Sequence, residues 1–152
     1  MQTRREILKR SATVAGLLAT TGLFPQYAFA AFNKAAFDAK SIADAVKAFG
    51  GSAPVESKEV TLTAPDIAEN GAVVPLAVAT TLAGVKHMLL LVEKNPSALV
   101  AKFDVTTAVD ANFATRAKMG QSSDVYAVAI MDDGKALFAK KEVKVTLGGC
   151  GG

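Results

Sequence analysis

The pattern of apolar and polar positions predicts one helical stretch near residue 33 and a series of strands after it. In NKAAFDAKSIADAVKAFGG (residues 33–51), apolar side chains recur at the three- and four-residue spacing of a helix. Asn33 is a suitable N-cap, and Gly50 with Gly51 marks the end of the stretch. We expect this helix to pack one face on the domain or on a partner.

From residue 57 onward the apolar period changes to two, which is typical of half-buried strands. Pro75 lacks the N–H that a central strand position would use, so its strand should be an edge strand or carry a bulge. Asp132-Asp133-Gly134 predicts a hairpin between the last two strands. The expected strands cover residues 57–64, 72–81, 85–94, 98–105, 113–119, 125–131 and 136–147.

About seven strands without intervening helices favour a mainly β fold over any α/β fold. We predict an immunoglobulin-like antiparallel β-sandwich with an N-terminal helix and a flexible glycine-rich C-terminal arm. The Cys…Trp…Cys pattern of antibody domains is absent, so the prediction concerns the architecture alone. Residues 85–94 (VKHMLLLVEK) are unusually apolar for a half-exposed strand and are our candidate for a partner-binding surface.

The last strand alternates Val143 and Val145 with Lys144 and Thr146, so the core should release the chain at about Leu147. The segment that follows, residues 148–152, reads GGCGG. Glycine accepts almost any backbone conformation and carries no side chain. The segment is therefore expected to be an arm.

In this arm, Gly148 and Gly149 form a hinge, while Gly151 and Gly152 leave nothing bulky beyond Cys150. Three residues past the end of the core give a reach of about 10 Å in an extended chain. A thiol presented in this way can enter a narrow site on another protein.

Cys150 is the only cysteine, so it cannot form an internal disulfide. Because residues 1–30 carry an export signal, described below, a single cysteine indicates an intermolecular bond or a reactive free thiol. Cys150 and the single histidine, His87, are too few ligands for a typical zinc or copper site, so we expect no metal and no cofactor. We interpret His87 as an ordinary strand residue. The arm holds no base or cation that could activate a thiol, which favours carriage over catalysis.

Residues 1–30 match a twin-arginine export signal. Arg4 and Arg5 stand in a basic region, an uncharged stretch follows at residues 11–24, and a small-x-small site ends at Ala30, where we expect cleavage. The uncharged stretch is shorter than the roughly 18 to 20 residues of a membrane-spanning helix, so no stable span is expected. The sequence thus predicts a periplasmic protein exported by the Tat pathway.

Removal of this segment changes the charge of the chain. Four of the 17 Lys and Arg residues and one of the 14 Asp and Glu residues lie in residues 1–30, so the remainder has no formal net charge. Nothing in this balance suggests binding to nucleic acid. We expect three parts: the signal peptide at 1–30, a helix and β-sandwich domain at 31–147, and the GGCGG arm at 148–152.

The terminal GGCGG, the preceding VKVTL strand, the twin-arginine signal and the sandwich-like body together resemble the SoxY family of sulfur carriers. The resemblance implies a non-enzymatic subunit that forms a heterodimer with SoxZ and holds sulfur intermediates covalently on Cys150. It further implies transient docking with three enzymes of thiosulfate oxidation. The SoxAX cytochrome would join thiosulfate to the thiol, and the SoxB hydrolase would release sulfate. The remaining sulfur would be oxidised further, with the SoxCD dehydrogenase as the enzyme, or passed on.

Two other classes of protein remain open. A ubiquitin-like sulfur carrier would activate a terminal Gly151-Gly152 as an adenylate, but the periplasm supplies no ATP and the β-grasp order of hairpin then helix is missing. An exported structural or interaction protein could use Cys150 to link two copies through a disulfide. Disulfide-linked dimers are also expected of an oxidised carrier. Substrate-derived mass on Cys150 would separate a sulfur carrier from such a disulfide-linked structural protein.

Overall fold

The computed structural model describes residues 3–20 and 33–146 and divides into two units, residues 1–32 and 33–152. The first unit contains helix α1 (Arg4–Thr20), in which Arg4 and Arg5 are both exposed. Among the described residues no helix is both long enough and apolar enough to cross a membrane. The expected cleavage site at Ala30 lies outside the described residues, so the signal peptide stays a prediction.

The helical stretch predicted at 33–51 is interrupted and forms two helices, α2 (Lys34–Asp38) and α3 (Ile42–Ala48). Asn33 caps α2 as expected, because its side chain accepts a hydrogen bond from Ala36 N. The interruption comes from Ser41, whose extended backbone starts a new helix and whose side chain accepts from Asp44 N. Apolar spacing alone did not reveal this second cap.

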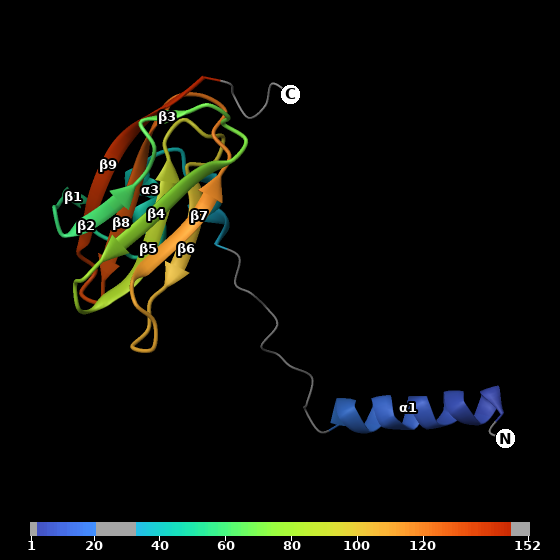
Figure 1. The fold of residues 1–152 in the computed structure, drawn as a ribbon. Helices are drawn as coiled ribbons and strands as arrows, with labels where there is room; N and C mark the ends of the chain where they lie inside the picture. The colour runs from blue at the N-terminus through green and yellow to red at the C-terminus, as the bar shows by residue number, and fades with distance from the viewer. Residues whose placement is uncertain (1–2, 21–32, 147–152) are drawn as a thin grey trace. The chain divides into compact units, whose positions relative to one another are not determined.

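The nine strands of residues 33–146 form two sheets (Figure 1). The larger sheet has the order β1-β9-β8-β5-β6, with β3 also paired to β9, and the smaller has the order β2-β4-β7. All seven predicted strands are present, and the pairings among them are antiparallel. The bounds are β1 (Val55–Glu56), β2 (Val60–Thr63), β3 (Ile67–Ala68), β4 (Val74–Thr80), β5 (Val85–Val92), β6 (Leu99–Asp104), β7 (Asn112–Ala117), β8 (Ser123–Met131) and β9 (Ala136–Val145).

Two short strands, β1 and β3, were missed by the sequence patterns. Each has two residues and pairs in parallel with β9, at opposite ends of it. A two-residue strand has no period to detect, so only the tertiary structure could show it. The predicted hairpin between β8 and β9 is confirmed, with Gly134 at φ +84° and Met131 N donating to Lys135 O at 2.8 Å.

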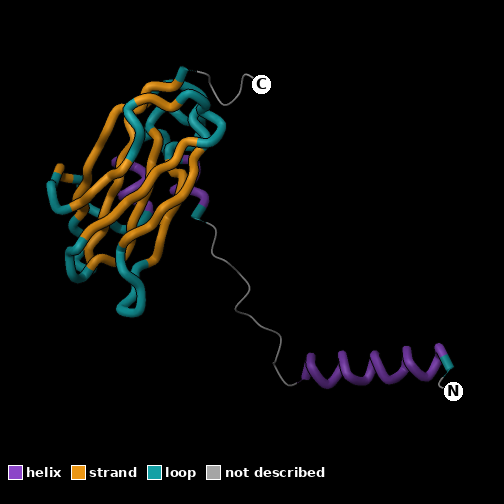
Figure 2. Tube along the Cα trace, in the orientation of Figure 1, coloured by secondary structure: helices purple, strands orange, loops and turns teal. Residues whose placement is uncertain are grey.

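Strand β5 is buried on both faces, which corrects our interpretation of residues 85–94 as a partner-binding surface. Met88 and Leu90 belong to the core between the two sheets. Leu89 and Leu91 belong to a second core under α2 and α3, the short helices seen beside the strands in Figure 2. The strand is continuously apolar because the chain covers both of its sides, as in other doubly covered strands.

The strand that contains Pro75 is not an edge strand, because β4 lies between β2 and β7. The register between β4 and β7 is continuous through Pro75, so there is also no bulge. Pro75 is tolerated because β2 ends at Thr63, which pairs with Ala77. Along β4 the backbone nitrogens point alternately toward β7 and toward β2, and Thr80 N points toward β7. Pro75 is five residues earlier, so its nitrogen points to the side of β2, at a position that β2 does not reach.

Candidate functional site

The point where the C-terminal arm is attached is held firmly by β3. Thr146, the last described residue, donates from its backbone N to Ala68 O at 3.1 Å and from Oγ1 to Glu69 O at 2.9 Å. Two residues earlier in the chain, Lys144 N donates to Asp66 O at 3.0 Å. These bonds continue the β3–β9 pairing to the end of the described chain.

The other side of the same segment is held by the start of β8. Val145 N donates to Ser122 Oγ at 2.9 Å, and Val143 is fully buried opposite Ser123. The body therefore fixes the position of Thr146, to which residues 147–152 are attached. Sequence reasoning missed this double bracing, because residues 66–69 and 122 carry no local signal of pairing with β9.

The predicted carrier residue, Cys150, lies outside the described residues, as do Gly148, Gly149, Gly151 and Gly152. Their roles stay predictions. The structure describes the strand that precedes them, β9. Its side chains alternate as expected, with Val143 buried and Lys144 and Thr146 exposed.

His87 is part of a polar cluster at the end of α3. Its Nδ1 lies 2.6 Å from Asp104 Oδ1, and Lys102 Nζ lies 2.5 Å from the same oxygen. The Phe49 ring is 6.1 Å from the His87 ring and 5.5 Å from Lys102 Nζ. These contacts join β5, β6 and α3, so His87 has a packing role.

Burial, followed by the charge of Lys102, lowers the pKa of His87 below its usual value of 6.5. The hydrogen bond from Lys102 is the main cause that lowers the pKa of Asp104. At neutral pH the cluster therefore holds a neutral imidazole beside a carboxylate and an ammonium group. This state agrees with a structural pairing of Asp104 with Lys102.

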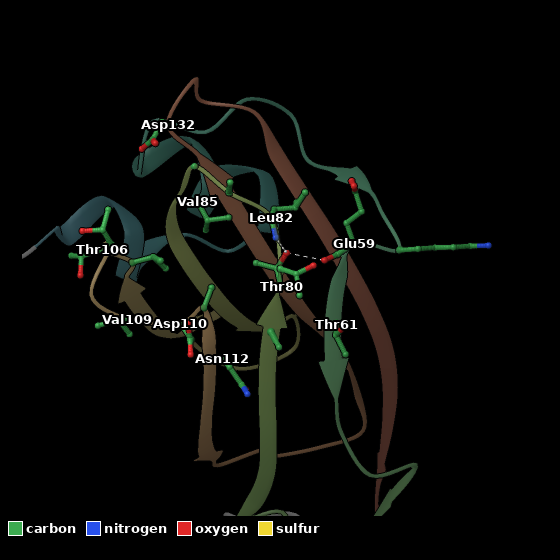
Figure 3. Close-up of a pocket in the computed structure, with 18 residues that line it drawn as sticks. Glu59, Thr61, Thr80, Leu82, Val85, Thr106, Val109, Asp110, Asn112 and Asp132 are labelled. Atoms are coloured by element: carbon green, nitrogen blue, oxygen red, sulfur yellow. Dashed lines mark hydrogen bonds between the residues drawn. The ribbon is translucent and has the colours of Figure 1, made fainter.

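A cleft of about 1070 Å³ opens at one end of the sandwich, between the start of β2 and the loops that follow β4 and β6 (Figure 3). Thr80 lines the cleft and connects two of its segments: its Oγ1 donates to Glu59 O at 2.8 Å and accepts from Leu82 N at 3.2 Å. Glu59, Asp110 and Asp132 contribute carboxylates to the lining. Among the described residues, no cluster of three or more His, Cys, Asp or Glu residues is suited to hold a metal ion.

This cleft lies too far from the arm to serve the thiol. Asp132 lines the cleft just before β9 begins, whereas Thr146 follows the far end of β9. Ten strand residues at about 3.3 Å each separate the two ends by about 30 Å. Cys150 is four residues beyond Thr146 and can be at most about 14 Å from it.

The chain is similar in sequence and in structure to known proteins. Residues 45–150 match the family described as "Sulfur oxidation protein SoxY". The solved structure of the sulfur carrier protein SoxY from Chlorobium limicola f thiosulfatophilum is 37% identical, with a TM-score of 0.61 over 68% of this chain and 94% of that chain. A search of the curated proteins found no match.

The same architecture occurs in a protein of different name. Superoxide reductase (neelaredoxin) from Ignicoccus hospitalis is 16% identical, with a TM-score of 0.51 over 57% of this chain and 79% of that chain. At this identity the likeness concerns the fold alone.

Proposed function

Because the chain belongs to the SoxY family of sulfur oxidation proteins, and is thus a sulfur carrier rather than an enzyme, we propose that it carries thiosulfate-derived sulfur covalently on Cys150. The observation that carries this proposal is the extent of the family match, which runs to residue 150 and so includes the only thiol of the chain. The cysteine is the one group in the sequence suited to reversible bonds with sulfur.

The geometry of the body supports a carrier. Thr146 is held by its hydrogen bonds to Ala68 O and Glu69 O, and its neighbour Val145 is held by Ser122, so only four residues separate this fixed point from the thiol. An unperturbed thiol has a pKa of about 8.5, so only a few per cent is thiolate at neutral pH. Activation must therefore come from the enzymes that the arm visits.

The proposed loading step is an oxidation. The thiolate sulfur of Cys150 bonds to the sulfane sulfur of thiosulfate, giving Cys–S–S–SO₃⁻, and the two electrons released pass to the haem groups of the SoxAX cytochrome. Water then attacks the sulfone sulfur in the SoxB hydrolase, the S–S bond to the sulfone breaks, and sulfate leaves with a persulfide remaining on Cys150. SoxCD dehydrogenase would oxidise that remaining sulfur. The flanking glycines leave room for each adduct in these sites.

The remaining parts of the proposal concern partners and location. We propose a heterodimer with SoxZ and transient docking with the three enzymes. We also propose export to the periplasm by the Tat pathway, directed by Arg4 and Arg5 and followed by cleavage after Ala30. Export of an already folded pair would suit a partner that lacks its own signal.

The test is the intact mass of the periplasmic protein, with and without reductant, after incubation with thiosulfate and the SoxAX cytochrome. We expect added mass in sulfur-sized or thiosulfonate-sized steps, removed by reductant and located on the C-terminal peptide. A chain that stays unmodified, or is linked only to a second copy of itself, would instead indicate an exported structural protein joined through Cys150.

Cys150→Ser is the matched variant for this test. It should abolish both the added mass and thiosulfate-dependent turnover, because the serine hydroxyl cannot form the disulfide bond. Its melting temperature should match that of the wild type, because residue 150 follows the last strand of the core. Retained turnover in this variant would exclude the carrier role.

A further inference from the structure

Two large apolar side chains are exposed at the end of the sandwich where the arm is attached. Ile67, on β3, is 59% exposed, and Val73, in the loop between β3 and β4, is 54% exposed. In Figure 1, β3 lies beside the end of β9. We refer to Ile67 and Val73 together as the arm-root surface.

The arm-root surface is tied to Thr146 through hydrogen bonds. Ile67 is paired with Lys144, and the next two residues of that segment accept both hydrogen bonds from Thr146. Ile67 therefore lies beside the strand end from which the arm continues.

The loop that presents Val73 is ordered by its own hydrogen bonds. Asn70 Oδ1 accepts from Ala72 N at 2.8 Å, and Gly71 O accepts from Met119 N at 2.7 Å. Val73 is exposed although its neighbour Val74 is fully buried. The loop therefore presents this apolar side chain to solvent at a defined place.

The short arm brings a partner onto this surface. The thiol can be at most about 14 Å from Thr146 when residues 147–150 are fully extended. An enzyme whose reacting groups lie several ångströms inside a channel can receive the thiol only if its rim touches the body around Thr146. The charged residues next to the arm-root surface, Asp66, Glu69 and Lys144, include both acidic and basic side chains. Their charge therefore favours neither a strongly acidic nor a strongly basic partner surface.

We propose that the arm-root surface is a docking site for an enzyme that processes the Cys150 adduct, and that this enzyme presents an apolar rim around a channel no deeper than about 14 Å. This inference rests on the proposed carrier function. Burial of Ile67 and Val73 against the rim stabilises the encounter, while the small size of the surface keeps the complex short-lived.

The double variant Ile67→Ser, Val73→Ser tests the proposal with the SoxB hydrolase and thiosulfonate-loaded protein. Sulfate release should show a KM for the carrier that is raised about tenfold, with kcat within twofold of wild type, because docking is weakened and chemistry is not. Alkylation of Cys150 by iodoacetamide should keep its wild-type rate. Val73→Ser alone, expected to raise KM about threefold, covers the case in which the double variant fails to fold.

Val109→Ser is the matched control. Val109 is 46% exposed in the loop between β6 and β7, at the cleft end of the sandwich. Its substitution removes a comparable apolar side chain away from the arm, so KM should be unchanged. An equal rise in KM for Val109→Ser would overturn the proposal, as would an unchanged KM for the double variant.

Two further outcomes separate this inference from the function on which it rests. Loss of the SoxZ heterodimer in the double variant would show that a permanent subunit occupies the surface, and it would overturn the enzyme-docking proposal alone. Wild-type protein that accepts no thiosulfate-derived mass would overturn both. Loading and turnover by wild type, with identical KM in the double variant, would overturn the docking site and leave the carrier function intact.

Discussion

At the scale of single residues, His87 shows how burial decides the role of a titratable group. Its side chain is 14% exposed, and it lies between Asp104 on β6 and Phe49 at the end of α3. Lys102 pairs with the same carboxylate, and Lys86 adds a further positive charge nearby. Protonation would place a second cation beside Lys102 in a partly buried site, which is unfavourable.

This environment predicts a stability that depends on pH. The folded pKa of His87 lies below 6.5, so just below pH 6.5 the unfolded chain binds protons more readily than the folded chain. The contribution of His87 should be complete above pH 6.5 and decrease as the pH falls through the lowered folded pKa. Urea unfolding of wild type should show this loss as the pH falls below about 6.5.

His87→Gln supplies the comparison, because the amide does not titrate. Its free energy of unfolding should change less than that of wild type over the same pH interval. The pKa of Asp104 is lowered from 3.8, so its stabilising contribution is lost only as the pH falls below that value. The two windows are therefore separate, and identical slopes for wild type and His87→Gln would contradict the role given to burial.

At the scale of elements, the end of α3 depends on two glycines with different requirements. Gly50 has φ +80° and open space where a Cβ would lie, whereas a Cβ at Gly51 would lie 2.5 Å from Val46 Cγ1 and 3.3 Å from Ile130 Cδ1. Val46 and Ile130 are buried, and a β-branched side chain in a helix has little rotamer freedom. Gly50 is therefore required by conformation and Gly51 by close packing.

Gly51→Ala should lower the free energy of unfolding by about 1–3 kcal/mol, because the added methyl overpacks the contact between α3 and β8. Gly50→Asn should cost much less, since Asn adopts the left-handed region more readily than other residues with side chains. Urea titrations of both variants measure the difference. Equal stability of Gly51→Ala and wild type would show that Val46 moves aside.

At the scale of the whole domain, residues 33–146 form three layers, with α2 and α3 on one face of the larger sheet and the smaller sheet on the other. The two apolar cores meet at β5, whose successive side chains enter them alternately. The most apolar strand thus lies between the two cores. Apolar residues left in water, such as Ile67 and Val73, stand at its end.

Leu89→Ala and Leu90→Ala test this arrangement, since one side chain lies in each core. Both substitutions should lower the free energy of unfolding of the purified chain by about 2–5 kcal/mol, because each leaves a cavity in a covered layer. Chemical denaturation without any partner is the measurement. A small effect for either one would indicate that this face of β5 is covered by another protein.

The sequence alone determined the features that local chemistry controls. Alternating apolar positions located seven strands, Asp132-Asp133-Gly134 located the hairpin, and Asn33 located the first helix cap. These signals depend on backbone conformation and on the side to which each residue points, both of which are fixed within a few residues. The resemblance carried by GGCGG and the rest of the chain likewise identified the SoxY family before any fold was known.

Only the tertiary structure decided which surfaces are covered. A continuous apolar strand has the same sequence whether a partner or the chain's own helices cover it, and the answer came from α2 and α3 packing on β5. Pro75 fits a central strand because β2 ends early, a fact about another segment. The hydrogen bonds of Thr146 to Glu69 and of Val145 to Ser122 likewise join residues distant in sequence, and no local pattern encodes such contacts.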